Sequence, residues 1–242
     1  MSPSKLFKPY IKSKSLELNS NSGLGLGTFL GKTLLERQNA KLLFKEDKNY
    51  IDEWLKKQIK LGVMQGRLLP KIDGRYQAHP FGYWQDEFPI ASKLGLDCIE
   101  FIFDYDKFEE NPLMTIEGRD KIKEVTQYTG VEVRSVCGDF FMDCPMHSKD
   151  KSQAAFSLEI LRRLIEVCSK LGIKDVVIPC VDQSSICEDE RTNRFLSAIQ
   201  SVLPLSESLE VRLCLETDLP PGRFFRLLKE LDSDSVSVNY DT

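Results

Sequence analysis

Ionisable and amide side chains recur near the ends of six apolar segments that we expect to be strands. The segments are LGVMQGRL (61–68), DCIEFIFD (97–104), VEVRSVCGDF (131–140), KDVVIPCVD (174–182), LEVRLCLETD (209–218) and SVSVNYDT (235–242). The polar residues at their ends are Gln65, Arg67, Glu100, Asp104, Asp139, Asp182, Glu216, Asp218 and Asp241. Carboxylates gathered in one concave rim repel each other unless a cation lies among them, and their oxygens suit a divalent metal. The pattern indicates acid–base or metal chemistry, although a single Asp after a strand is often only a helix cap.

Helical segments separate these strands and would bring their ends together. In residues 152–172 the apolar side chains keep helical spacing. Two segments, KLGLDCIEF (93–101) and KLGIKDVVI (170–178), predict a helix that ends at a glycine, Gly95 or Gly172, before the next strand. Repeated strand–helix units predict a parallel sheet covered by helices.

The choice between an open sheet and a barrel depends on alternation along the strands. In residues 209–218, Val211, Leu213 and Leu215 share one face, and Arg212, Cys214 and Glu216 share the other. An apolar face under helices and a polar inner face favour a barrel over a sheet covered on both sides. We therefore predict an α/β fold of the (β/α)8 barrel type, incomplete because the chain supplies six βα units.

Composition excludes several classes of protein. With 33 basic and 37 acidic residues the net charge is −4, so broad binding to nucleic acid is not expected. No apolar run is long enough to cross a membrane. The seven cysteines form no C-x-x-C pair and indicate buried, reduced thiols in a cytoplasmic protein.

Residues 1–60 differ from the rest and are interpreted as a partly flexible N-terminal extension. The segment GLGLGTFLGKT (23–33) matches neither nucleotide-binding pattern, because Leu26 and Leu30 stand where glycine is required. With two histidines and no G-x-S-x-G motif, the sequence disfavours histidine-rich metal sites and serine hydrolases.

Several segments together resemble the sugar phosphate isomerase/epimerase family of xylose-isomerase-like TIM barrels. They are GVMQGRLLP (62–70), FPIASKLGLDCIEFIFD (88–104), GDFFMDCP (138–145), VVIPCVDQSS (176–185), CLETDLPPGRFF (214–225) and VNYDT (238–242). The resemblance covers residues 61–242 in collinear order, which we therefore treat as a partial barrel of this type. It implies a sugar or sugar-phosphate isomerase or epimerase with one divalent metal, Mn²⁺, Mg²⁺, Co²⁺ or Zn²⁺.

The resemblance also implies roles for individual residues. It places two metal ligands on Glu216 of LETD and Asp241 of NYDT. Glu216 would also be the catalytic acid–base group that moves a proton at the carbon beside a carbonyl. Substrate contacts are expected from Glu100, from Arg67 beside a substrate phosphate, and from His147; for each, a purely structural role stays open.

The family pattern continues with a His and a Glu that have no counterpart before Thr242. We therefore expect the metal to be weakly held or absent, and expect that residues 1–242 by themselves do not epimerise sugars. The expected partners are a small sugar or sugar phosphate, with a homo-oligomer left open. The alternatives are a non-catalytic truncated barrel or binding module, and a polyol dehydratase of the same superfamily.

Overall fold

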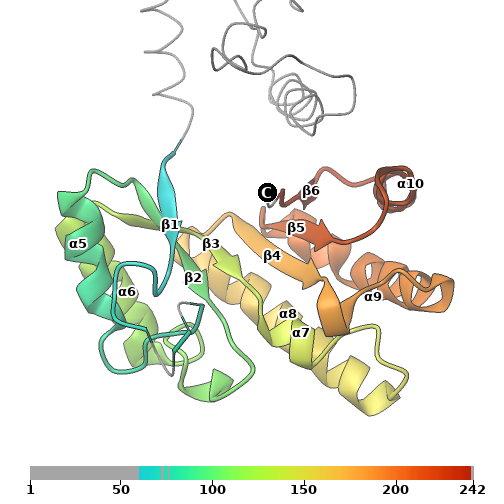
Figure 1. Ribbon diagram of the computed structural model, residues 1–242, viewed down its shortest axis with the longest axis horizontal. Helices are drawn as coiled ribbons and strands as arrows, with labels where there is room; N and C mark the ends of the chain where they lie inside the picture. The colour runs from blue at the N-terminus through green and yellow to red at the C-terminus, as the bar shows by residue number, and fades with distance from the viewer. Residues whose placement is uncertain (1–59, 72–73, 76, 241–242) are drawn as a thin grey trace, which may run out of the picture. The chain divides into compact units, whose positions relative to one another are not determined.

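A computed structural model describes residues 60–71, 74–75 and 77–240 (Figure 1). These residues belong to one compact unit, Lys60–Thr242. The N-terminal segment that we interpret as an extension, with its GLGLGTFLGKT motif, lies outside the described residues, as does the proposed metal ligand Asp241. The division into an extension and a barrel therefore stays a prediction.

Six parallel strands form one sheet in the order of the chain, from β1 to β6. They are β1 (Gly62–Met64), β2 (Cys98–Ile102), β3 (Glu132–Cys137), β4 (Asp175–Cys180), β5 (Arg212–Thr217) and β6 (Val236–Val238). Each lies within one of the predicted segments, and β1 and β6 are shorter than expected. The fold is α/β and of the TIM-barrel type, as the alternation of strands and helices predicts.

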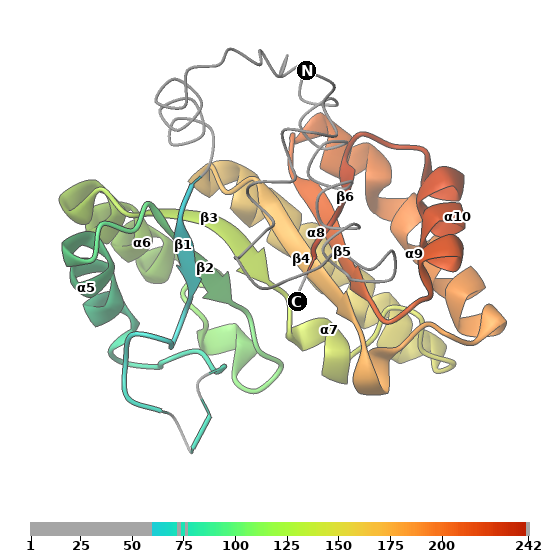
Figure 2. The same ribbon diagram turned by 45° about the horizontal axis from the view of Figure 1, so that its top comes forward.

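Helices follow the strands and lie together on one side of the sheet (Figures 1 and 2). The α-helices are α5 (Glu87–Lys93), α6 (Ile116–Thr129), α7 (Phe140–Asp143), α8 (Lys151–Leu171), α9 (Asp189–Ser208) and α10 (Pro221–Leu231). Short 3-10 turns occur at η1 (Trp84–Asp86), η2 (Phe108–Glu110) and η3 (Asp182–Ser184). Helix α5 packs on β2, α6 on β3, α8 on β4 and α9 on β5.

The core lies between the sheet and these helices. In β5, Leu213 and Leu215 are buried in it together with Val211, which directly precedes the strand. Arg212 and Glu216 are half-buried on the other face. This is the alternation expected from the sequence, and removal of the apolar face from water stabilises the sheet against the helices.

Two glycines end helices as the repeated Leu-Gly pairs predict. Gly172 caps α8 with a φ of 74°, and its N–H donates to the carbonyls of Cys168 and Ser169. Gly95, one residue beyond the C-cap of α5, also has a φ of 74°. Only glycine adopts this left-handed conformation without steric cost, so both chain reversals depend on it.

The cysteines are buried thiols rather than a redox or zinc motif. All seven are free, and all except Cys187 are buried. Burial raises the pKa of the Cys214 thiol to about 12, with a smaller contribution from the nearby Asp175 carboxylate. Among the described helices, none is long and apolar enough to cross a membrane.

Candidate active site

One face of the sheet carries a row of polar side chains at equivalent positions of neighbouring strands. Glu100 of β2 pairs with Ser135 of β3, Ser135 with Asp175 of β4, and Asp175 with Arg212 of β5. Residues in register on adjacent strands point to the same face, and so do residues two apart on one strand. The polar face defined in this way comprises Glu100, Ser135, Cys137, Asp175, Arg212, Cys214 and Glu216.

Glu100 lies in the middle of β2, not at its end, which corrects the position expected from the sequence. Its Oε2 accepts a hydrogen bond of 2.7 Å from the Ser135 hydroxyl. Burial raises the pKa of the Glu100 carboxyl, and the negative charges of Glu216 and Asp139 raise it further, against the lowering effect of Ser135. The environment of Glu100 therefore favours its protonated form.

Glu216 is the penultimate residue of β5, in register with Pro179 of β4. Its Oε2 accepts a hydrogen bond of 2.8 Å from the Asn239 side chain, just beyond β6. The alternation of residues 209–218 places Glu216 on this face, but nothing in the sequence singles out Asn239 as its partner. This amide donor orients the Glu216 carboxylate.

Arg67 is linked to the end of β3 through Gln77. The Arg67 guanidinium lies 3.5 Å from the Gln77 side-chain oxygen, and the Gln77 amide donates to Asp139 Oδ2 at 2.8 Å. The other Asp139 oxygen accepts from the Cys137 thiol at 3.1 Å. The loop after β1 thus reaches the carboxyl end of β3, a link that the sequence does not indicate.

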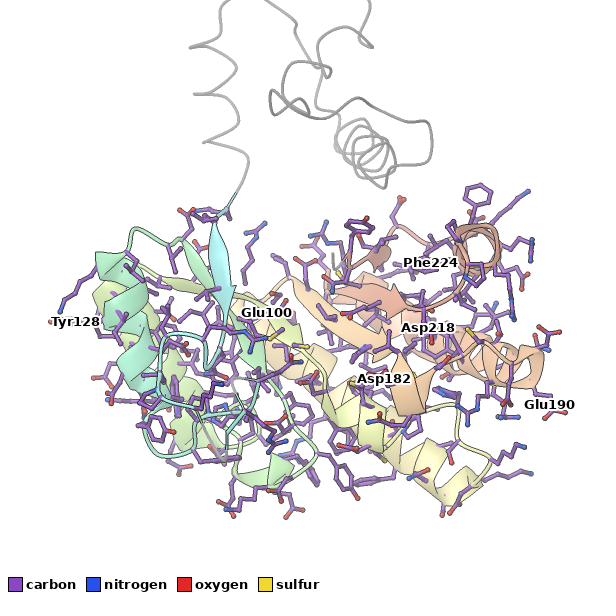
Figure 3. The ribbon with its side chains drawn as sticks, viewed as in Figure 1. Glu100, Tyr128, Asp182, Glu190, Asp218 and Phe224 are labelled. Atoms are coloured by element: carbon purple, nitrogen blue, oxygen red, sulfur yellow. The ribbon has the colours of Figure 1, made fainter. Side chains whose placement is uncertain are left out.

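Asp182 and Asp218 follow β4 and β5 and lie at the ends of those strands (Figure 3). Asp218 Oδ1 accepts a hydrogen bond of 3.0 Å from the Ser185 hydroxyl, which joins the two loops. Asp182 adopts a left-handed φ of 50° at the start of η3. Asp218 therefore helps to hold the loops after β4 and β5 in place.

His147 lies against α9 rather than on the polar face. Its backbone carbonyl accepts a hydrogen bond of 2.8 Å from Arg194 Nε, and its ring packs edge-on against Phe195 at 6.0 Å. Burial lowers the pKa of His147 to about 4, with the nearby Arg191 and Arg194 adding to the effect. The substrate contact expected of His147 stays a prediction.

The family resemblance implies a divalent metal, which would need several ligands on this face. Within residues 60–71, 74–75 and 77–240, no three His, Cys, Asp or Glu side chains are placed to hold an ion together. Glu216 is the one expected ligand that the structure describes. The described donors therefore do not fit a metal, since divalent cations in proteins need several oxygen or nitrogen ligands.

Curated proteins similar to this chain are named as epimerases. A 2-epi-5-epi-valiolone 7-phosphate 2-epimerase of Actinoplanes sp. is 25% identical over 154 residues, which are 63% of this chain and 55% of that protein. The L-ribulose-5-phosphate 3-epimerase UlaE of Escherichia coli is 27% identical over 165 residues, 67% of this chain and 54% of the relative. The chain thus spans about half the length of the curated relatives it matches.

Solved structures show the same fold. A D-psicose 3-epimerase crystallised in the presence of D-fructose superposes with a TM-score of 0.57 at 14% identity, covering 74% of this chain and 62% of that one. An IOLI protein with a bound zinc atom gives 0.55 at 17% identity, with the same coverage of the two chains. The family model described as the xylose isomerase-like TIM barrel matches residues 88–242. This chain, with six parallel strands in its described part and a family match over residues 88–242, belongs to the xylose isomerase-like TIM barrel family.

Proposed function

We propose that the polar face contributes the acid–base part of a site that epimerises or isomerises a sugar or sugar phosphate. The observation that carries the proposal is the oriented Glu216 carboxylate near the end of β5, on the same face as the half-buried Glu100. Catalytic residues of such barrels lie at the carboxyl ends of the strands. The epimerase names of the two curated relatives support this class of reaction.

In this proposal Glu216 is the base. Its carboxylate takes the proton from the carbon beside the substrate carbonyl, and the electrons of that C–H bond move onto the carbonyl oxygen to give an enediolate. Asn239 holds the carboxylate in the reactive orientation. Return of a proton to the opposite side of the carbon would give the epimer, and return to the same side would regenerate the substrate.

Glu100 and Arg67 are assigned to substrate binding. A protonated Glu100 carboxyl donates a hydrogen bond to a substrate oxygen that becomes negative during the reaction. The raised pKa of this carboxyl supports the assignment. Arg67, held near Asp139 through Gln77, takes a phosphate or hydroxyl group of the substrate.

A metal enters the proposal only through Glu216 together with Asp241, which lies outside the described residues. Because the described donors do not fit an ion, none of the proposed steps uses one.

We expect Glu216→Gln to lower proton exchange by about 100-fold, as loss of a general base does. The full chain is incubated in D₂O with L-ribulose 5-phosphate or D-fructose, and deuterium at the carbon beside the carbonyl is followed by NMR. Exchange of the proton for deuterium needs only the base. Inversion at the same carbon also needs a proton donor on the opposite side of that carbon. That residues 1–242 form no epimer stays a prediction, which the same spectra check.

The matched control is Glu230→Gln, an exposed glutamate on α10 that should leave the exchange rate unchanged. Wild-type protein without exchange above the buffer rate would overturn the proposal and favour a non-catalytic binding module. Full exchange by Glu216→Gln would also overturn it, because another group would then be the base.

We expect Mn²⁺ to bind with a dissociation constant on the order of 1 mM or weaker, since few ligands are available to the ion. Calorimetric titration of the full chain measures the affinity, with Asp218→Asn as the control at a neighbouring carboxylate. Micromolar affinity that Glu216→Gln abolishes and Asp218→Asn leaves intact would contradict this expectation and establish Glu216 as a metal ligand.

A further inference from the structure

A second candidate site lies at the amino ends of the strands, on the edge of the sheet opposite the end of β5 that carries Glu216. It is a cavity of about 450 Å³ between the second half of α6, the start of β3 and the end of α8. Lys174, which lines it, directly precedes β4. Figure 3 shows Tyr128, near the end of α6, well separated from Asp182 and Asp218 at the other strand ends.

The charge of this cavity is positive in a protein whose net charge is −4. Three basic side chains line it, Lys123, Arg134 and Lys174, against one acidic side chain, Glu132. Lys123 makes a loose ion pair of 3.9 Å with Asp120. The Arg134 and Lys174 side chains neither donate a hydrogen bond to, nor form an ion pair with, any residue that the structure describes. Two cations are therefore available to a ligand.

A bulge in β3 explains why Arg134 lines this cavity. Ile99 of β2 pairs with Val133, but the next residue, Glu100, pairs with Ser135, so Arg134 has no partner in the ladder. An extra residue of this kind redirects a side chain out of the regular alternation. Arg134 consequently lines the same cavity as its neighbour Val133, whose side chain belongs to the core under the helices.

We infer that this cavity binds a phosphate group carried by a small organic molecule. Arg134 and Lys174 pair with the phosphate oxygens, and Lys123 adds a long-range attraction. The volume exceeds what a phosphate alone fills, and Ile122, Val133 and Leu171 offer apolar contact to the rest of the molecule. The site is independent of the proposed chemistry at Glu216.

The test measures binding of inorganic phosphate and glycerol 3-phosphate to the full chain by calorimetry, at ionic strength matched with NaCl. We expect saturable binding, tighter for glycerol 3-phosphate. Arg134→Ala and Lys174→Ala should each weaken it at least about tenfold, as loss of a charge-assisted hydrogen bond does.

Lys170→Ala is the matched control, because Lys170 is an exposed lysine at the end of α8 that does not line the cavity. Unchanged affinity in this variant, together with loss in the two cavity variants, would support the site. Equal loss in Lys170→Ala would show attraction to surface charge only and would overturn it. Absence of saturable binding, or binding lost in Glu216→Gln but kept in the cavity variants, would overturn it as well.

Discussion

Phe140→Ala should lower the free energy of unfolding by about 3–5 kcal/mol, the range for truncation of a fully buried phenylalanine. Phe140 begins α7 and is completely buried. Five aromatic rings surround it with centroids between 5.2 and 6.2 Å away: Phe103, Tyr105, Phe108, Phe141 and Phe156. Phe103 and Phe141 are buried and held by their own packing, so small shifts refill only part of the cavity left by the missing ring. Urea unfolding at equilibrium measures the change.

The control for this variant is Phe225→Ala on α10, where the side chain is 67% exposed and the cost should stay within about 0.5 kcal/mol. Similar losses in the two variants would contradict the packing described here. The cluster matters for the site because Asp139, which accepts hydrogen bonds from Gln77 and Cys137, directly precedes Phe140. A folded Phe140 variant should therefore also show altered exchange of the Gln77 amide.

Much of the fold could be predicted because its signals are local. The left-handed conformations of Gly95 and Gly172 follow from the type of residue at a helix end. The polar face of β5 follows from the alternation of apolar and polar residues, which places Glu216 opposite Leu213 and Leu215. Such patterns lie within about ten consecutive residues, and no contact with a distant segment is needed to interpret them.

The rest of the site depends on contacts between segments distant in sequence. A one-residue bulge between β2 and β3 aligns Glu100 with Ser135 and displaces Arg134, and no pattern within either strand specifies that register. Asn239 becomes the partner of Glu216 across 23 residues. His147 follows a strand as an active-site residue would, yet packing against Phe195 places it beside α9.

His79 is the second residue for which we expect a large effect, and its hydrogen bonds define its protonation state. Gln65 Oε1 accepts from the Ile102 N–H at 3.0 Å, so the same oxygen must also accept from His79 Nδ1 at 2.9 Å. Nδ1 therefore carries the proton of the neutral ring. Nε2 is buried without a partner, and the ring packs against Phe81 and Phe101. Burial lowers the pKa of His79 to about 3.

The protein should consequently lose stability in acid. An unfolded histidine binds a proton below about pH 6.5, whereas folded His79 stays neutral until about pH 3, so the free energy of unfolding falls as the pH falls between these values. Each pH unit in that interval costs about 1.4 kcal/mol for this histidine. The buried carboxyls act in the opposite sense, because the raised pKa values of Glu87 and Glu100 favour folding at low pH.

His79→Asn separates these contributions, since the asparagine amide can replace Nδ1 as donor to Gln65 but does not titrate. Urea unfolding between pH 6 and 4 should show a slope smaller by about 1.4 kcal/mol per pH unit than in wild type. The carboxyls are present in both proteins and cancel in the comparison. His147→Asn is the matched comparison: His147, whose pKa is about 4, should contribute a similar slope between pH 6 and 4. Between pH 4 and 3 only His79→Asn should still lower the slope, because the pKa of His79 is about 3. Identical slopes in wild type and His79→Asn would mean that His79 is protonated in the folded protein, and the hydrogen-bond arrangement around Gln65 would then have to be different.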